Sequence, residues 1–319
     1  MDVTDWLLDS DPAIRWQVLR DLTDEPPEAA EAERAKVTTE GWGAALLALQ
    51  DDKGYWGGDE YGEDRKSVHW TLQSLRRFGI DPDAPSVASA VKLVHDNVVW
   101  HYWDDLPYFS GEVEPCINGG VLASAAYFGA LGEGSDRIIA RLLAEQLEDG
   151  GWNCEAPEST KASFDTTLCV LEGLAEYERA ASQVNTSEET DADRVVLTAV
   201  TTARHRGEEY LLEHNLFRRL STGEIVQPRY GNLSFPPYWF YDILRALDYF
   251  RSTGQVADPR VEDAIDKLIA QRQDDGRWLA GKPWPGEVYF ALDAPEDEPS
   301  RWNTLRALRV LRWWDGELG

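Results

Sequence analysis

The sequence predicts an all-α protein, an α/α toroid in which about six inner helices are surrounded by five to six outer helices. A helix–turn–helix unit with Gly and Trp in its turn recurs along the chain, and apolar and amphipathic segments of helical period alternate. A strand pattern is confined to residues 287–292, where neighbouring Pro and Gly weaken it. Hairpins that repeat in this way bury their apolar faces against one another. We therefore expect a closed double layer, with an open solenoid as the structural alternative.

The turn of the repeated unit has a distinct sequence. A Gln is followed by Gly and Trp from Gln50 to Trp56 and from Gln146 to Trp152, and a third unit that ends at Trp278 differs in length by one residue. Gly can end the first helix with a left-handed residue, and Trp can pack between hairpins. The Gln amide can bond backbone groups left unpaired at a helix end. Each unit is therefore interpreted as helix, turn, helix.

The helices fall into two sets by composition. Inner helices are apolar on most faces, as helices buried all round should be, whereas outer helices have one apolar stripe and one charged face. In chain order, the expected inner segments are 13–22, 67–75, 117–131, 164–171, 238–250 and 302–308. The expected outer segments are 30–50, 87–99, 137–147, 193–217 and 260–273. We expect the whole chain, residues 1–319, to form a single toroid domain.

The charge of the chain excludes several classes of partner. Its 319 residues contain 31 Lys and Arg against 58 Asp and Glu, a formal charge of −27, which opposes binding to nucleic acid or to anionic lipid. Arg supplies 24 of the 31 cations, and this acidic, Lys-poor composition is typical of a halophilic protein in molar salt. No run of about 18 apolar residues occurs, so no integral membrane segment is expected. The first residues carry no leader signal, and we expect a cytoplasmic location with three free thiols.

The Gln-x-x-x-Gly-x-Trp units resemble the QW repeats of the superfamily that contains squalene–hopene cyclases, class II terpene cyclases and protein prenyltransferase β-subunits. The resemblance spans residues 40–315. It implies a toroid that binds a small apolar or isoprenoid ligand in an aromatic central cavity. If the protein is an enzyme, the resemblance implies cyclisation by proton-initiated carbocation chemistry. The superfamily also includes noncatalytic binding modules, so the fold alone does not fix the function.

The cyclase motif is only partly retained. Class II cyclases carry Asp-x-Asp-Asp-Thr-Ala at the start of an inner helix, and the middle Asp protonates an alkene. In the matching stretch, Asp165 is retained and Phe164 occupies the position of the acid. The resemblance thus names Asp165 as the catalytic acid, assisted by His69 or Asp242, although an acid of this strength is usually held protonated by neighbouring carboxyls. A helix N-cap is the other interpretation of Asp165.

The prenyltransferase metal motif is also incomplete. That family binds zinc through Asp-x-Cys and a later His, whereas Thr167 stands at the Cys position here. No cofactor is therefore expected. A zinc site would have to be assembled from Asp165, Cys169, Cys116 or His69. Otherwise Cys116 and Cys169 are small buried core residues.

The inner helices of a toroid run parallel, so their N-termini meet at one mouth. Helix N-termini carry partial positive charge and unpaired N–H groups, which favour an anionic part of a ligand. Aromatic and polar residues at that mouth are typical of a binding cavity. The expected ligand-binding residues there are Trp70, Asn118, Phe164, Tyr238, Trp239, Trp302 and Asn303.

Two loops add further candidates. Trp103, Asp104 and Asp105 lie in an aromatic loop whose carboxylates could bind a divalent ion, act in acid–base chemistry, or simply cap the loop. Arg218, Arg219 and Arg229 follow an outer helix and could clamp an anion, with ordinary ion pairing to nearby Glu as the alternative.

Three hypotheses of function follow. The first is the cyclase-like protein that binds an isoprenoid. The second is a carbohydrate-active toroid that uses Asp104, Asp105 or Asp242 as paired carboxylates on aromatic platforms. The third is a noncatalytic interaction domain, which is favoured if Trp284, Tyr289 and Phe290 from residues 282–299 plug the mouth. The sequence does not decide the oligomeric state.

Overall fold

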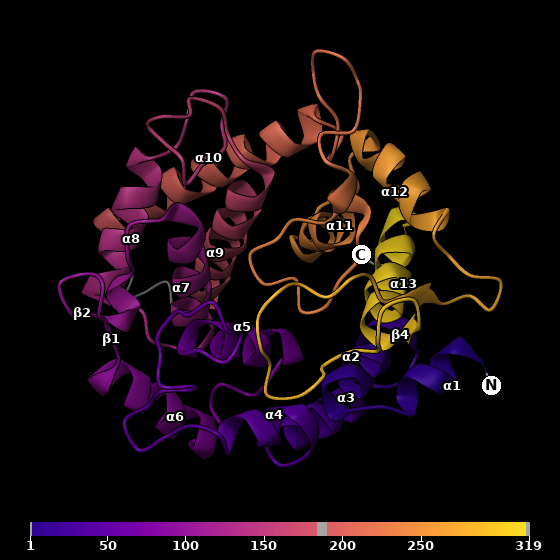
Figure 1. The fold of residues 1–319 in the computed structure, drawn as a ribbon, viewed down its shortest axis with the longest axis horizontal. Coiled ribbons are helices and arrows are strands. Elements are labelled where there is room, and N and C mark those ends of the chain that lie inside the picture. The colour runs from indigo at the N-terminus through magenta and orange to yellow at the C-terminus, as the bar shows by residue number, and fades with distance from the viewer. Residues whose placement is uncertain (1, 184–189, 317–319) are drawn as a thin grey trace.

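The inner layer of the protein is a ring of six helices, and the computed structural model describes residues 2–183 and 190–316 (Figure 1). Each inner helix is buried over most of its surface. The expected all-α class is confirmed. The inner helices are α2 (Pro12–Leu22), α5 (Val68–Phe78), α7 (Pro115–Tyr127), α9 (Phe164–Gln183), α11 (Ile243–Ser252) and α13 (Arg301–Trp314).

The outer layer alternates with the inner one along the chain. Its helices bury one stripe and leave the other face in solvent, which is the amphipathic pattern expected from the sequence. They are α3 (Pro27–Arg34), α4 (Gly41–Leu47), α6 (Pro85–Asn97), α8 (Glu133–Ala144), α10 (Asp191–Glu213) and α12 (Glu262–Ile269), and α1 (Val3–Leu8) precedes the ring. The strands form two antiparallel pairs, β1 (Val99–Trp100) with β2 (Leu106–Pro107) and β3 (Trp278–Leu279) with β4 (Pro299–Ser300).

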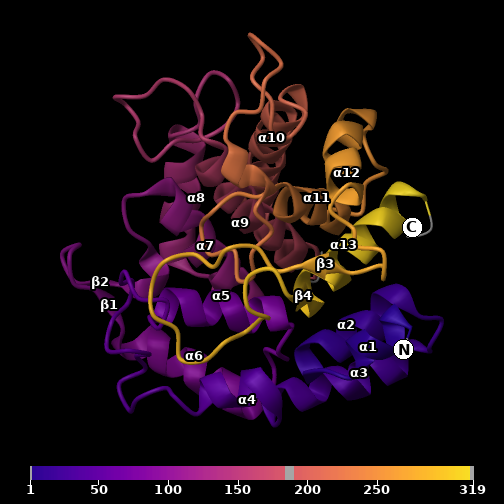
Figure 2. The ribbon, with the colours of Figure 1, turned by 45° about the vertical axis from the view of Figure 1, so that its right-hand side comes forward.

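The ring closes where its last helix meets its first. Helix α13 packs against α2, which Figure 2 shows grouped with α1 and α3. Arg309 Nη1 donates to Gln17 Oε1 at 2.7 Å, and Arg312 Nη1 donates to the Asp21 carbonyl at 2.9 Å. Because these bonds join residues almost 300 positions apart in the chain, the structure is a closed toroid and not an open solenoid.

Several helix bounds differ from those expected. The outer segment 30–50 is two helices joined by a 3₁₀ turn at Ala35–Thr38, and residues 287–292 form no strand. The inner segment expected at 238–250 begins only at Ile243, because two prolines and Tyr238, at φ 52°, hold the preceding chain outside helical conformation. The Asp242 carboxylate then caps the helix by accepting the N–H of Arg245. None of the described helices is long and apolar enough to cross a bilayer.

Helices α7 and α9 approach each other unusually closely. A Cβ atom placed on Gly119 would lie 2.3 Å from the Cys169 carbonyl oxygen, and one on Gly173 would lie 2.4 Å from the Gly119 carbonyl oxygen. Only glycine fits at these two positions. The close approach brings the start of α7 next to the loop that precedes α9.

The repeated Gln and Trp side chains bond the ends of helices. The indole N–H groups of Trp56, Trp152 and Trp278 each donate to a carbonyl ten residues earlier, at 2.7–2.8 Å. Gln50 and Gln146 each donate to a carbonyl in the next outer helix, at 2.9 and 2.8 Å. The repeat therefore ties each turn to its own helix and, in the first two units, to the neighbouring hairpin.

We expect Gln146→Ala to lower the free energy of unfolding by about 1 to 2 kcal/mol, because it leaves the Ala203 and Gly150 carbonyls without their donor. The matched control is Gln271→Ala, since the Gln271 amide reaches only the Lys267 carbonyl of its own helix, at 3.5 Å. That change should stay within about 0.5 kcal/mol. Urea unfolding midpoints measure both variants. Equal losses would show that the bond between hairpins contributes nothing.

Candidate functional site

A cavity of about 530 Å³ lies at the end of the ring where most inner helices finish. The last turns of α2, α5, α7 and α11 contribute Asp21, Arg77, Tyr127 and Ser252 to its wall, and α9 contributes residues of its middle turns. Its rim reaches solvent, since the Arg179 side chain is 44% exposed. The cavity is therefore at the opposite end of the ring from the mouth that the sequence pointed to.

The wall of this cavity is strongly basic. It holds nine arginines and five carboxylates, an excess of four positive charges in a chain of net charge −27. The carboxylates are Asp21, Glu31, Glu172, Glu176 and Asp248, and each is ion-paired to at least one arginine. The arginines are Arg20, Arg34, Arg76, Arg77, Arg179, Arg245, Arg251, Arg306 and Arg309.

Glu172 is shared by three of these arginines. Its carboxylate oxygens lie 2.7 Å from Arg245 Nε, 3.0 Å from Arg77 Nη2 and 3.4 Å from Arg76 Nη2. Burial by itself raises the pKa of Glu172, but Arg245 and Arg77 outweigh it and lower the pKa to about 2. Burial, with Arg245 and Arg76 nearby, lowers the pKa of Arg77 to about 9. Glu176 also pairs with Arg76, at 3.1 Å, so two carboxylates face three cations.

A second shared carboxylate is Asp248. Arg309 Nε and Arg251 Nε each lie 2.8 Å from its Oδ1. Burial raises the pKa of Asp248, but the two guanidinium groups reverse the effect and lower it. Burial also lowers the pKa of Arg251, and nearby Arg309 adds to that shift.

Arg306 forms no ion pair with any carboxylate of the residues described. Its Nη2 donates to Asn303 Oδ1 at 2.7 Å and to the Ser234 carbonyl at 3.4 Å, while Nε has no hydrogen-bond partner there. The side chain is buried, and burial lowers its pKa. It lies in the first half of α13, where the negative end of the helix dipole does not compensate its charge. Arg306 is therefore a buried cation without a direct ion pair among the described residues, although the charges of Asp242 and Asp248 lie near enough to act on it.

Aromatic rings form the apolar part of the wall. Trp302 stacks on Phe235 with ring centroids 4.0 Å apart and on Phe78 at 5.8 Å. The Trp16 indole N–H donates to the Phe78 carbonyl at 2.7 Å, and the Arg20 guanidinium lies 4.5 Å from the centre of the Trp16 ring. The cavity thus combines guanidinium groups with flat apolar surface.

The mouth at the N-termini of the inner helices is packed, which corrects the expected position of the cavity. The space between His69, Trp70, Tyr238 and Trp239 amounts to about 10 Å³, too little for more than a water molecule. Trp302 and Asn303 do not join this group: Trp302 lines the basic cavity instead. Asn303 donates to the carbonyls of Leu233 and Leu279, at 2.7 and 2.9 Å.

The connection between β3 and β4 covers this packed end (Figures 1 and 2). Trp284 stacks on Phe240 with ring centroids 3.8 Å apart. The Glu287 carbonyl accepts the N–H of Arg65 at 2.8 Å. Tyr289 and Phe290 pack against the core. Trp284, Tyr289 and Phe290 are the three residues that the third hypothesis required at the mouth. Trp239 also borders a separate surface hollow of about 490 Å³.

Asp165 and Arg229 pair with each other. The two carboxylate oxygens accept from Arg229 Nη1 and Nη2 at 3.0 and 2.6 Å, and Oδ1 also accepts the N–H of Tyr241 at 2.7 Å. Both carboxylate oxygens are therefore bound by a bidentate guanidinium and are not directed at a ligand. Next to it, Phe164 is buried against the rings of Tyr210 and Tyr230.

The two expected assistants of Asp165 are buried apart from the cavity wall. Burial, with Arg77 and Arg65 nearby, lowers the pKa of His69 to about 3, and its Nδ1 lies 3.2 Å from the Tyr108 hydroxyl. Asp242 caps α11, and burial raises its pKa. Asn118 has a structural role too, because its amide bonds both backbone groups of Glu112, at 2.8 and 2.9 Å.

The two candidate loops do not form sites with the cavity. Asp104 and Asp105 are exposed at the turn between β1 and β2, with φ near 50°, and Trp103 packs against the core beside them. Arg218 pairs with Asp263, and Arg219 donates to the Val226 carbonyl at 3.1 Å. Arg229 pairs with Asp165. The three expected clamp arginines therefore have three separate partners and do not share an anion site. The structure also does not bring Asp104 or Asp105 to the buried Asp242.

The residues proposed for zinc are likewise dispersed. Within the described part of the chain, three potential metal ligands gather at Glu114, Cys116 and Cys154. Of the four residues named from the sequence, this group contains only Cys116. His69 instead faces Tyr108, and Asp165 faces Arg229.

Sequence reasoning missed the arginines of the cavity. A signal for them exists, because α13 carries Arg306 and Arg309 one turn apart on a helix that is mostly buried, and α11 carries Arg245 in the same way. Arginine is almost never fully buried unless it has a partner. An inner helix with several arginines therefore indicates a charged interior.

Neither a protein-family model nor a curated protein sequence matches the chain. Among solved structures, a protein from Actinoplanes is similar over 96% of this chain and 90% of its own, with 18% identity and a TM-score of 0.43. The type II terpene cyclase MstE from Scytonema is similar over 89% of this chain and 97% of its own, with 12% identity and a TM-score of 0.29. A variant of MstE in complex with its substrate, geranylgeranyl dihydroxybenzoate, covers 89% and 95% of the two chains, with 14% identity and a TM-score of 0.31.

Proposed function

We propose that the protein binds a small amphiphilic anion in the basic cavity, with the acid group on the arginines and the apolar part on the aromatic wall. The observation that carries this proposal is the excess of four positive charges around about 530 Å³ of space. A cavity of this size holds a small molecule.

The charge balance favours an anionic ligand over a neutral one. Buried cations without enough counter-charge are costly, and only Glu172 and Glu176 face Arg245, Arg77 and Arg76 among the residues described. Phosphate and carboxylate groups match the planar fork of a guanidinium and would supply the missing negative charge. Arg306 provides the clearest point of attachment, because its Nε has no partner within the described structure.

The aromatic wall favours a ligand with an apolar part. A bare inorganic ion would leave the side chains of Trp16, Phe235 and Trp302 in contact with water. An apolar chain or ring would cover them. An isoprenoid ligand satisfies both parts of the wall when it carries a diphosphate.

We favour binding over catalysis at this cavity. Each of its five carboxylates is ion-paired to arginine, so each already has a partner other than a ligand. The candidate acid Asp165 is bound by Arg229, away from the cavity wall. A binding or carrier protein therefore fits the site better than a cyclase.

Three ligands test the proposal: geranylgeranyl diphosphate, geranylgeraniol and inorganic pyrophosphate. Because Trp16 and Trp302 line the cavity, tryptophan fluorescence can follow each titration, at low and at molar KCl, with calorimetry as a check. We expect the diphosphate ester to bind at least tenfold more tightly than either the alcohol or pyrophosphate. Equal affinity for alcohol and diphosphate would remove the role of the arginines. Failure of all three to bind would overturn the proposal.

A further inference from the structure

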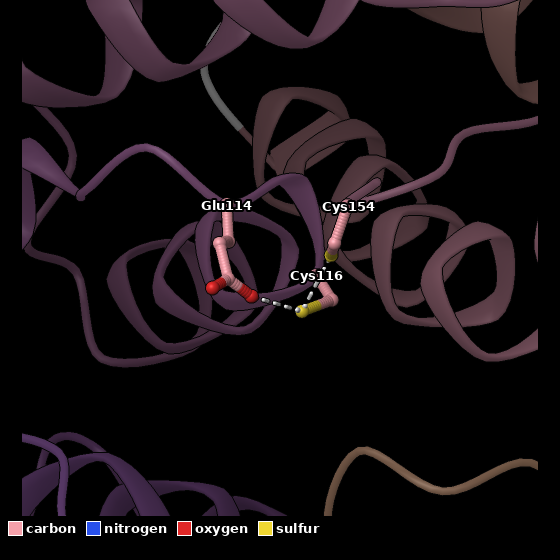
Figure 3. A group of neighbouring side chains, drawn as sticks. All are labelled: Glu114, Cys116 and Cys154. Carbon is pink, nitrogen blue, oxygen red and sulfur yellow. Dashed lines mark hydrogen bonds between the residues drawn. The ribbon is translucent and has the colours of Figure 1, made fainter. Parts of the chain in front are cut away.

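Three potential metal ligands lie together at the opposite end of the ring from the basic cavity. Cys154 Sγ is 3.0 Å from Cys116 Sγ, which is 3.7 Å from Glu114 Oε2, and the three ligand atoms all lie within 4.8 Å of one another. Figure 3 shows the Glu114 carboxylate and the Cys154 thiol both directed toward Cys116. The proposed function uses none of these residues.

The fold holds these ligands in place from two sides. Glu114 and Cys116 flank Pro115, which begins α7 and fixes the backbone there. Cys154 lies in the loop before α9, where its N–H donates to Thr166 Oγ1 and the Thr166 hydroxyl donates to its Sγ, both at 3.4 Å. The close packing of Gly119 on α9 then fixes the start of α7 beside that loop.

We propose that Glu114, Cys116 and Cys154 form a binding site for Zn²⁺. Zinc takes thiolate sulfur at about 2.3 Å and carboxylate oxygen at about 2.0–2.2 Å, so a tetrahedral ion needs about 3.8 Å between sulfurs and about 3.5 Å between sulfur and oxygen. The Cys116–Glu114 separation of 3.7 Å already matches. The two sulfurs, now 3.0 Å apart, have to separate by roughly 0.8 Å, which half-buried side chains can do by rotation.

The donor set selects the metal. Two thiolates favour zinc over Mg²⁺ or Ca²⁺, which prefer oxygen ligands alone. Three protein ligands leave the fourth position of a tetrahedral ion to water, as in zinc sites that bind an exchangeable ligand. Cys169 does not belong to the site, because it is buried and donates to the Trp239 carbonyl at 3.5 Å.

Cobalt and zinc titrations of the reduced, chelator-treated full chain test this site. We expect one equivalent of Co²⁺ to produce a near-ultraviolet thiolate-to-cobalt charge-transfer band, and Zn²⁺ to displace the cobalt and abolish the band. Cys116→Ser and Cys154→Ser should each weaken metal binding at least tenfold, and Glu114→Gln should weaken it while preserving the band. The matched control Cys169→Ala removes a thiol outside the site and should leave both the affinity and the band unchanged.

The result that overturns the proposal is a wild-type protein that gives no charge-transfer band and binds no zinc in competition with a chromogenic chelator. A band that persists in the Cys116→Ser/Cys154→Ser double variant overturns it as well. Circular dichroism of each variant confirms folding, and the wild-type titration decides the matter even if a variant fails to fold. Because this readout does not involve the basic cavity, its outcome is distinct from that of the ligand titrations.

Discussion

Glu172→Gln is expected to lower the free energy of unfolding by about 3 to 5 kcal/mol, the cost of leaving buried charges without their partner. Arg245 and Arg77 have no other carboxylate partner among the residues described, Arg76 is shared with Glu176, and the Glu172 side chain is only 16% exposed. The amide keeps the shape of the side chain but removes its charge, so Arg245 and Arg77 lose their ion-pair partner while Arg76 keeps Glu176. Urea unfolding at neutral pH measures the loss.

The matched control is Glu209→Gln. Glu209 also accepts two hydrogen bonds from one arginine, Arg260, at 2.6 and 3.1 Å, but its side chain is 51% exposed. An exposed pair of this kind contributes at most about 1 kcal/mol. If both variants lost the same free energy, the shared buried carboxylate would have no special role.

The same carboxylate predicts a pH dependence. The pKa of Glu172 falls from 4.5 to about 2 on folding, since Arg245 and Arg77 outweigh the effect of burial. A lowered acid pKa means that the unfolded chain binds more protons between these values. The stabilisation is therefore complete above pH 4.5 and is lost as the pH falls toward 2. The Glu172→Gln variant should lose less stability than the wild type over this window, and parallel losses in the two proteins would contradict the assignment.

Arg306→Gln is expected to weaken binding of geranylgeranyl diphosphate ten- to hundredfold, because a charge-assisted hydrogen bond contributes about 1.5 to 3 kcal/mol. The unliganded variant should be as stable as the wild type or more stable. Arg306 is a buried cation without an ion pair in the described structure, burial lowers its pKa, and a Gln amide can still donate to Asn303. Ligand titration and urea unfolding of the same preparation measure the two effects.

Arg179→Gln provides the comparison for Arg306. Arg179 lies at the rim, where it is 44% exposed and already paired with Glu176 at 2.7 Å, so its loss should change affinity less than threefold. A structural role of Arg306 alone would appear as lost stability with unchanged affinity. That outcome would contradict its assignment to the ligand.

The helical class and the order of the helices follow from local sequence. The alternation of apolar and amphipathic segments is set by residues three and four apart, and each expected inner or outer segment contains helix. The turn chemistry is equally local, since Trp56, Trp152 and Trp278 each bond a carbonyl ten residues away. The late start of α11 is the main departure, caused by two prolines and the Asp242 cap.

The candidate site could not be predicted in the same way. Helix dipoles favour an anion at the N-termini of the inner helices, and this expectation placed the cavity at the wrong end. His69, Trp70 and Tyr238 fill that end together with the β3–β4 connection, whereas the arginines surround a cavity at the other. Only Trp302 of the residues expected to bind ligand lines that cavity.

By itself, the sequence determined an acidic chain of alternating helices whose Gln and Trp side chains tie the hairpins together, because those features depend on neighbours along the chain. Tertiary structure alone decided which end is filled and which is hollow. It also decided that three arginines from α5 and α11 share one carboxylate of α9. The physical reason is that a buried charge is governed by the partners that surround it in space, and these come from segments up to about 290 positions apart, as with Gln17 and Arg309.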